Sequence, residues 1–464
     1  MIDVFKTVWE NAYKKYFNEN TRDNLSQFTE SETPIEKSKF AHDQYGMKIG
    51  IDIGGGTSDV LIYETANQRG DTTNVPLLAT SFSFAGNVMF GKINGDSAVM
   101  LNSENVWFNV LKKQVSETGT ISGNGVTANI VDIDPNKHNI TDFMDFIFTH
   151  ILNNREAEIR LAMSNPALKF ISLMHISALI WEVAKVCKVK LKDMYPDLIA
   201  LSGNGSKLIL MSEKNCDEKD RIIKKLFEGI FQTIYKKDFP DIKIDIYKEP
   251  KKATAEGALS LLALRKGKDR VNVAKVNYSL YRERLYLLSE DDENELSNVG
   301  GSCGGISIVN NVPNPDSSSE DLFGGMFDSA PMPEPPTKKT EPDSEENYGA
   351  CPETNCISRD WKEIAAEVGL FLDFYFRLAG APLGGKISTS GISTIKTNIF
   401  GSDSRYDTEK MQTLIERAKK TIEIRAQVMS NGLSPDFRIK DSIFLAVMAQ
   451  IIAEVIKFFG KNSK

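Results

Sequence analysis

The residues best suited to chemistry form one short turn at 52–59, with the sequence DIGGGTSD. Its three consecutive glycines carry no Cβ, so the backbone can adopt positive φ there and its N–H groups can approach an anion closely. The hydroxyls of Thr57 and Ser58 add donors for phosphate oxygens. The pattern therefore predicts a phosphate-binding turn.

The two acids that flank this turn need an explanation of their own. Asp52 ends an apolar run and enters the turn, where a bare carboxylate would repel a phosphate. It is useful there if it holds a water of a hydrated Mg²⁺ or orients the water that attacks the terminal phosphate. The alternative is an ordinary glycine-rich hairpin, which needs one or two glycines and leaves Asp52 and Asp59 unexplained.

Strands on both sides must position the turn. Residues 47–53, MKIGIDI, alternate apolar and other side chains, and residues 59–63, DVLIY, predict the second strand of a hairpin. Residues 77–84 are predicted to form a third strand. We expect residues 85–139 to be a small insertion that contains strands.

Helices and strands then alternate along the chain. Helical periodicity covers 140–154, 166–191, 217–235 and 251–266, and strands are predicted at the start of 196–210 and at 243–250. Such alternation indicates an α/β domain with a mixed sheet. Residues 1–46 are predicted to be an amphipathic helix with a polar lead-in, 47–266 the α/β domain, and 267–298 a connector.

The last third of the chain changes character. Residues 299–357 are rich in Gly, Pro, Ser and acidic residues and poor in branched aliphatic ones, which predicts a disordered linker. Residues 358–464 show helical patterns at 359–380, 408–429 and 440–460. We expect them to form either a separate all-α module or a helical appendage of the α/β domain.

Composition excludes several classes of function. The chain has 464 residues and a formal charge of −7, so it lacks the excess of basic residues that binding to nucleic acid requires. Apolar stretches at 168–184 and 443–459 are interrupted by charged or amide residues, which predicts core helices and no membrane span. Five scattered cysteines form no disulfide framework, which indicates the reducing cytoplasm.

The turn at 52–59 resembles a family motif. DIGGGTSD is similar to the second phosphate-binding motif, D-x-G-G-G-T-x-D, of the actin-like ATPases. Actin, heat-shock chaperone ATPases, sugar kinases and bacterial division and filament proteins share that fold, in which two lobes close over ATP and a metal ion. The resemblance implies that Asp52 lies near the metal and the attacking water, and that Thr57 contacts the terminal phosphate.

Two later segments resemble family motifs and follow in the family's order. Residues 201–207, LSGNGSK, are similar to the adenosine-binding motif, although Lys207 replaces the arginine found in the chaperones. Residues 249–258 resemble the second connecting motif, where small residues such as Ala253 and Gly257 would let this helix approach the other lobe. Lys251 stands where the chaperones have an acid.

The resemblance covers residues 47–266, which correspond to the second lobe alone. It implies a ribonuclease-H-like mixed-sheet lobe with a helical insertion, followed by the linker and the C-terminal helices. The first lobe, with its own D-x-G-T/S hairpin, should precede Asp52 by many more than the 51 residues present. We therefore expect a split or truncated gene, a first lobe supplied by a second polypeptide, or a lobe that acts alone.

The implied function is an ATP-binding lobe of a chaperone-type or filament-type ATPase, with ATP and Mg²⁺ as ligands and hydrolysis dependent on a first lobe from elsewhere. The alternative is a non-hydrolysing scaffold that binds a protein partner or itself. A sugar kinase is disfavoured because the sugar site depends on the absent lobe. Asp52 and Thr57 are the implied catalytic residues, with Asp52 also the metal ligand, and the implied nucleotide-binding residues are Gly54, Gly55, Gly56, Thr57, Ser58, Asp59, Gly203, Asn204, Gly205, Ser206 and Lys207.

Overall fold

The computed structural model describes the chain in segments. These are residues 46–68, 71–93, 104–118, 140, 143–144, 162–191, 194–212, 222–237, 241–247, 249, 252–257, 259, 360–380, 389–401, 405–430 and 442–462. The predicted N-terminal helix, the connector at 267–298 and the linker at 299–357 lie outside the described residues.

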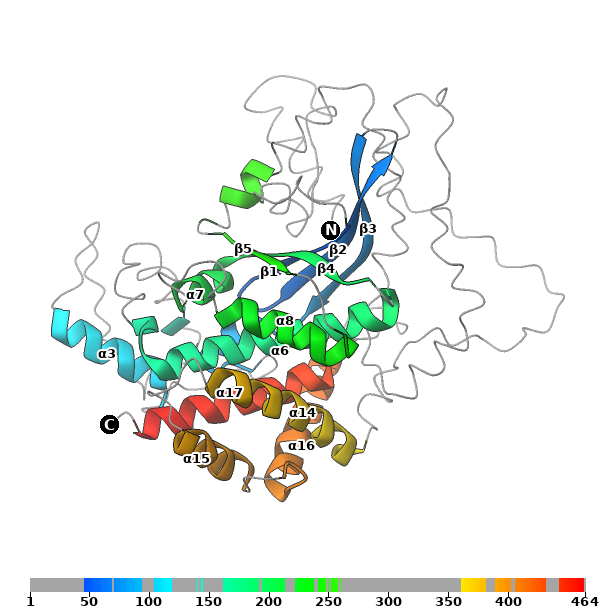
Figure 1. The fold of residues 1–464 in the computed structure, drawn as a ribbon. Coiled ribbons are helices and arrows are strands. Elements are labelled where there is room, and N and C mark those ends of the chain that lie inside the picture. The colour runs from blue at the N-terminus through cyan, green and yellow to red at the C-terminus, as the bar shows by residue number, and fades with distance from the viewer. Residues whose placement is uncertain are drawn as a thin grey trace.

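A five-stranded sheet forms the centre of the α/β part (Figure 1). Its strands are β1 (Gly46–Ile53), β2 (Ser58–Gln68), β3 (Asp71–Phe82), β4 (Pro196–Ser202) and β5 (Lys243–Ile246). The spatial order is β3-β2-β1-β4-β5, with antiparallel pairing among the first three strands and parallel pairing of β1 with β4 and of β4 with β5. The predicted hairpin, third strand and mixed α/β sheet are confirmed.

Alternation along β1 explains which face of the sheet carries the main core. Met47, Ile49, Ile51 and Ile53 are at most 1% exposed and belong to the same hydrophobic cluster as helix α6 (Pro166–Leu191). Helix α8 (Ile222–Tyr235) packs on α6, and helix α7 (Asn204–Ser212) follows β4 and contacts β1, β4 and β5. Figure 1 shows α6 and α8 together on one side of the sheet.

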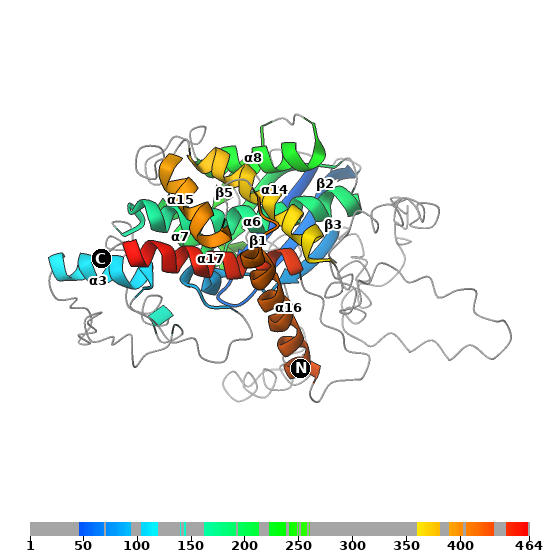
Figure 2. The ribbon, with the colours of Figure 1, turned by 90° about the horizontal axis from the view of Figure 1, so that it is seen from below.

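The C-terminal helices add a second layer beyond α6 (Figure 2). They are α14 (Trp361–Gly380), α15 (Thr389–Phe400), α16 (Glu409–Ser430) and α17 (Ile443–Asn462), and α15 was not foreseen from the sequence. The Tyr375 hydroxyl donates a hydrogen bond to the Phe170 carbonyl of α6 at 2.6 Å, and all four helices contribute to the same core cluster as the sheet. This packing favours a helical appendage of the α/β domain over a separate module.

The region predicted as a strand-containing insertion has helices and no strand in its described residues, 85–93 and 104–118. It contains the short 3₁₀-helix η2 (Gly86–Phe90) and α3 (Val106–Thr118), so the expectation of strands is wrong for these residues. Asn105 caps α3 by accepting a hydrogen bond from the Trp107 N–H at 3.0 Å. The Trp107 indole N–H donates to the Met89 carbonyl at 2.6 Å, which fixes α3 against η2.

Two helices are long and apolar enough to cross a membrane, judged by length and composition alone. They are Pro166–Lys188 and Ile443–Asn462, and 94% and 72% of their most apolar windows are buried inside the protein. The prediction that both are core helices is confirmed by this burial. Buried core helices of soluble proteins have the same length and composition, so the two helices are only a weak indication of a membrane span.

Candidate functional site

The glycine turn between β1 and β2 is closed by its own backbone. The Gly54 N–H donates a hydrogen bond to the Thr57 carbonyl at 2.9 Å, while Gly55 and Thr57 are exposed. None of the three glycines has φ in the left-handed region, contrary to the expectation from sequence. Absence of a side chain matters instead for packing, because a Cβ on Gly54 would lie 3.0 Å from the Thr57 carbonyl oxygen.

The loop after β3 is hydrogen-bonded to the same turn. The Gly86 N–H donates to the Gly54 carbonyl at 3.0 Å, and the Asn87 N–H donates to the Gly55 carbonyl at 2.9 Å. Sequence reasoning missed both residues. The available signal was the small pair Ala85-Gly86 directly after the third predicted strand, where a loop can approach another backbone closely.

The second predicted turn, between β4 and α7, packs directly against the first. Gly203 has φ +81° and is buried, and a Cβ there would overlap the Ile53 carbonyl oxygen and lie 2.6 Å from Asp52 Oδ1. A Cβ on Gly205 would lie 2.5 Å from Ile53 Cγ2. Because β1 and β4 are parallel neighbours, both turns leave the sheet at the same edge, which is where α/β proteins bind ligands.

Asp52 lies at the junction of the two turns. Its side chain is 3% exposed, and the Ser202 hydroxyl donates a hydrogen bond to its Oδ2 at 3.1 Å. Ser202 is also its register partner on β4. The carboxylate is thus fixed at the carboxyl ends of two parallel strands, beside the N-terminus of α7.

Other predicted site residues fall into two groups. The Ser58 hydroxyl is buried and donates to the Phe84 carbonyl at 2.7 Å, and the Ser206 hydroxyl donates to the Gly203 carbonyl at 2.7 Å. Both hydroxyls hold the local fold together. Asn204 is exposed, and Asp59 and Lys207 are half-buried, so these three side chains reach the surface around the turns.

No protein-family model matches this chain. No curated protein and no solved structure matches it either.

The site offers one fixed carboxylate to a metal ion. Among the described residues, no group of three or more His, Cys, Asp or Glu side chains could hold a metal by itself. Mg²⁺ in nucleotide sites keeps several waters and takes one or two carboxylates together with phosphate oxygens. The buried Asp52 fits that limited role, in which the nucleotide brings most of the ligands.

The segment that resembles the second connecting motif is described in part. Residues 252–257 are helical, and the Ala253 N–H donates to the Glu249 carbonyl at 2.9 Å. Ala253 and Gly257 are both buried and lie four residues apart, so they occupy one side of this helix. Lys251 lies outside the described residues.

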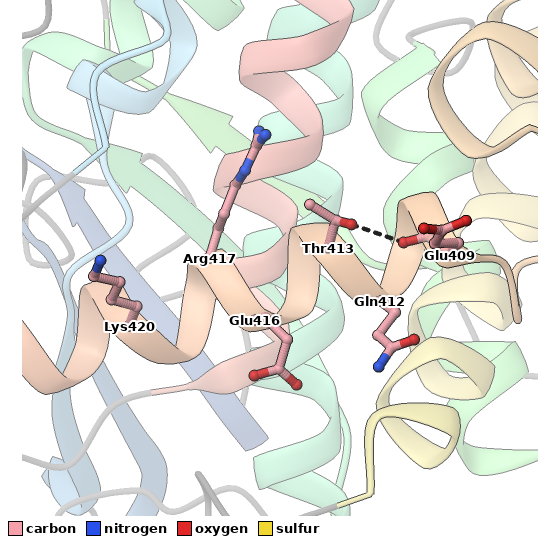
Figure 3. A pocket seen from close by; sticks show the side chains of 6 residues that line it. All are labelled: Glu409, Gln412, Thr413, Glu416, Arg417 and Lys420. Carbon is pink, nitrogen blue, oxygen red and sulfur yellow. Dashed lines mark hydrogen bonds between the residues drawn. The ribbon is translucent and has the colours of Figure 1, made fainter.

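A surface groove of about 460 Å³ lies along α16 (Figure 3). Six residues of this one helix line it: Glu409, Gln412, Thr413, Glu416, Arg417 and Lys420. The Thr413 hydroxyl donates to the Glu409 carbonyl at 2.8 Å, and Arg417 pairs with Glu454 of α17 at 3.6 Å. The groove is a charged, solvated helix face, and it shares no residue with the glycine turns.

His175 of α6 packs against the residues that follow β3. It is buried and stacks on Phe84, with ring centroids 4.5 Å apart. Neither ring nitrogen makes a hydrogen bond of good geometry among the described residues, and the nearby Ala85 backbone offsets only part of the cost of burial. Burial lowers the pKa of His175 from 6.5 to about 3, because the charged ring would lose its hydration. The neutral ring is part of the buried packing around Phe84, two residues after the end of β3.

A pH dependence of stability follows from this burial. Because the folded pKa of His175 is below the unfolded value, its contribution is present above pH 6.5 and is lost as pH falls toward 3. We expect the native chain to lose up to about 1.4 kcal/mol per pH unit more than His175→Phe over that window. Urea unfolding at pH 7, 6 and 5 measures the difference, and parallel losses in the two proteins would contradict it.

Proposed function

We propose that this chain is the ATP-binding second lobe of an actin-like ATPase, with a ribonuclease-H-like sheet, and that hydrolysis needs a first lobe from elsewhere. The observation that carries the proposal is the contact of Gly203 and Gly205 with Ile53, which brings the two glycine turns to one edge of the sheet. The motif order and the mixed sheet, with a hairpin followed by two parallel strands, also support it.

The turns supply the groups that a nucleotide needs. Gly55 is exposed and has no Cβ, so a phosphate could approach its N–H closely, whereas the Gly54 N–H is already bonded to the Thr57 carbonyl at 2.9 Å. Helix α7 begins at Asn204, and its N-terminal N–H groups and dipole favour a negative charge. The exposed Thr57 would donate its hydroxyl to the terminal phosphate, and the half-buried Lys207 would add a cation.

Asp52 would be the carboxylate partner of a bound Mg²⁺. The ion, when bound with ATP, neutralises charge on the β- and γ-phosphates. Asp52 would hold a water of that ion or orient the attacking water, and the hydrogen bond from Ser202 keeps its carboxylate in place. Thr57 would steady the transferred phosphoryl group by donating a hydrogen bond.

Under this proposal, the chain provides the phosphate-binding groups of one lobe and not those of the other. We therefore expect weak ATP binding and little turnover from it alone, because effective phosphoryl transfer requires ligands on both sides of the phosphate chain.

Combining Asp52→Asn with Gly55→Val is expected to weaken binding of Mg²⁺–ATP at least about tenfold. The first change removes the fixed carboxylate, and the second places a branched side chain on the exposed turn, where even a Cβ would lie 3.2 Å from Asn87 Oδ1. Isothermal titration of the full chain measures the effect. Asp407→Asn, the same loss of charge at an exposed residue before α16, is the control and should bind like the native chain.

Equal heats for the native chain and the double variant would refute the proposal. The internal hydrogen bonds of Ser58 and Ser206 favour the second candidate, a non-hydrolysing scaffold, because they remove two of the predicted phosphate donors. That candidate predicts self-association independent of nucleotide. Sedimentation with and without Mg²⁺–ATP separates the two functions.

A further inference from the structure

We infer that Asn87 is a further binding residue of this site, and that its side-chain amide donates a hydrogen bond to the phosphate chain of the nucleotide. The inference rests on the proposed function, because it concerns the same glycine turn. It adds a third loop, the one after β3, to the two turns that sequence motifs identify.

The backbone of Asn87 is fixed to the exposed part of the turn. Its N–H donates to the Gly55 carbonyl at 2.9 Å, and the neighbouring Gly86 N–H donates to the Gly54 carbonyl at 3.0 Å. These two parallel hydrogen bonds set the distance between the loop and the turn. These bonds therefore hold the backbone of Asn87 in place beside Gly55.

The side chain of Asn87 lies beside Gly55, an exposed residue of the turn that a bound phosphate would contact. A Cβ on Gly55 would be 3.2 Å from Asn87 Oδ1 and 3.9 Å from Nδ2. Gly55 itself is exposed, and Asn87 is half-buried. The amide thus borders the open side of the turn, where an anion bound by the glycine N–H groups would lie.

A side-chain amide is chemically suited to donate a hydrogen bond to a phosphate beside Gly55. Asn carries two N–H donors and no charge, and its oxygen and nitrogen exchange places by a flip of the side chain. No hydrogen bond of the Asn87 amide is present among the described residues, so its donors remain available for a ligand. An aspartate of the same shape would instead repel a phosphate.

Packing behind Asn87 keeps it in position. Asn87 is the second residue of η2, directly after Gly86, and its carbonyl accepts a hydrogen bond from the Lys92 N–H at 3.2 Å. Farther along η2, the Met89 carbonyl accepts the hydrogen bond of the buried Trp107 indole. A binding residue held on both sides by backbone hydrogen bonds is preorganised, so little ordering is needed when the ligand binds.

The test compares Asn87→Ala and Asn87→Asp with the native full chain. Isothermal titration with Mg²⁺–ATP and with inorganic tripolyphosphate measures affinity for the whole nucleotide and for the phosphate chain alone. We expect Asn87→Ala to weaken both about tenfold, because a hydrogen bond to a charged group is lost, and Asn87→Asp to weaken both further by repulsion. Asn398→Ala on α15, the same change at an exposed side chain that donates to the Thr394 carbonyl, should bind like the native chain.

Each outcome distinguishes this inference from the proposed function. If the native chain binds ATP and both Asn87 variants bind as tightly, the role of Asn87 is overturned and the proposed function stands. If the native chain binds neither ATP nor tripolyphosphate, both are overturned. Thermal unfolding without nucleotide should be unchanged in Asn87→Ala; a large fall in its midpoint would mean a purely structural role and would also overturn the inference.

Discussion

Replacing Gly203 with alanine is expected to separate the two glycine turns, to abolish measurable ATP binding and to lower the free energy of unfolding by roughly 2–4 kcal/mol. Gly203 has φ +81°, which costs an L-residue about 1–2 kcal/mol. The new Cβ would also overlap the Ile53 carbonyl oxygen and crowd Asp52 Oδ1 at 2.6 Å. Because the obstacle is backbone, relief requires movement of β1 or of the start of α7.

Gly401→Ala is the matched control for this substitution. Gly401 ends α15 with φ +85°, and a Cβ there would meet only the side chain of Lys410, at 3.6 Å. It should therefore cost only the strain of the left-handed backbone, about 1–2 kcal/mol, and leave ATP binding unchanged. Chemical unfolding and isothermal titration measure the two effects. Equal losses in both variants would show that the contact between the turns is unimportant.

The sequence predicted the parts of the site that depend on local pattern. Alternation in 47–53 identified β1, and glycine runs after two apolar strands identified both turns. The reason is that strand period and side-chain-free turns are short-range properties. The positive φ was expected at 54–56 but occurs at Gly203, because the tertiary contact with Ile53 decides where the chain must bend.

The contact between the loop after β3 and the first turn was not predictable in the same way. Gly86 and Asn87 are about thirty residues away from Gly54 and Gly55 in sequence, and the link consists of backbone hydrogen bonds, which carry no side-chain signal. The pairing of β2 with β3 determines this contact. The register that places Ser58 opposite Phe82 brings the end of β3 beside the turn.

For the C-terminal helices, too, local sequence patterns predicted most of the elements but not how they pack. Helical periodicity predicted α14, α16 and α17, but α15 was missed because its sequence, TSGISTIKTNIF, is rich in Thr, Ser and Ile, which are weaker helix formers. Docking of these helices onto α6 could have been suspected from α6 itself. That helix is apolar on nearly all sides and needs partners beyond the sheet.

Replacing Phe371 with alanine is expected to destabilise the whole protein by about 3–5 kcal/mol, the range for removing a fully buried aromatic ring. Phe371 of α14 is 0% exposed. Its ring centroid lies 5.5 Å from that of Trp181 on α6 and 5.5 Å from that of Phe444 on α17, in edge-on geometry. The ring therefore joins three helices, two of which come from the C-terminal layer.

Leu370→Ala is the matched control, because its side chain is the immediate neighbour and is 58% exposed. It should change the free energy of unfolding by less than about 0.5 kcal/mol. Guanidinium unfolding followed by circular dichroism and tryptophan fluorescence measures both variants. If α14–α17 belong to the core of the α/β domain, one cooperative transition shifts in Phe371→Ala by both probes. Two transitions, of which only one shifts, would show that the C-terminal helices fold as a separate module and that α6 keeps its structure without them.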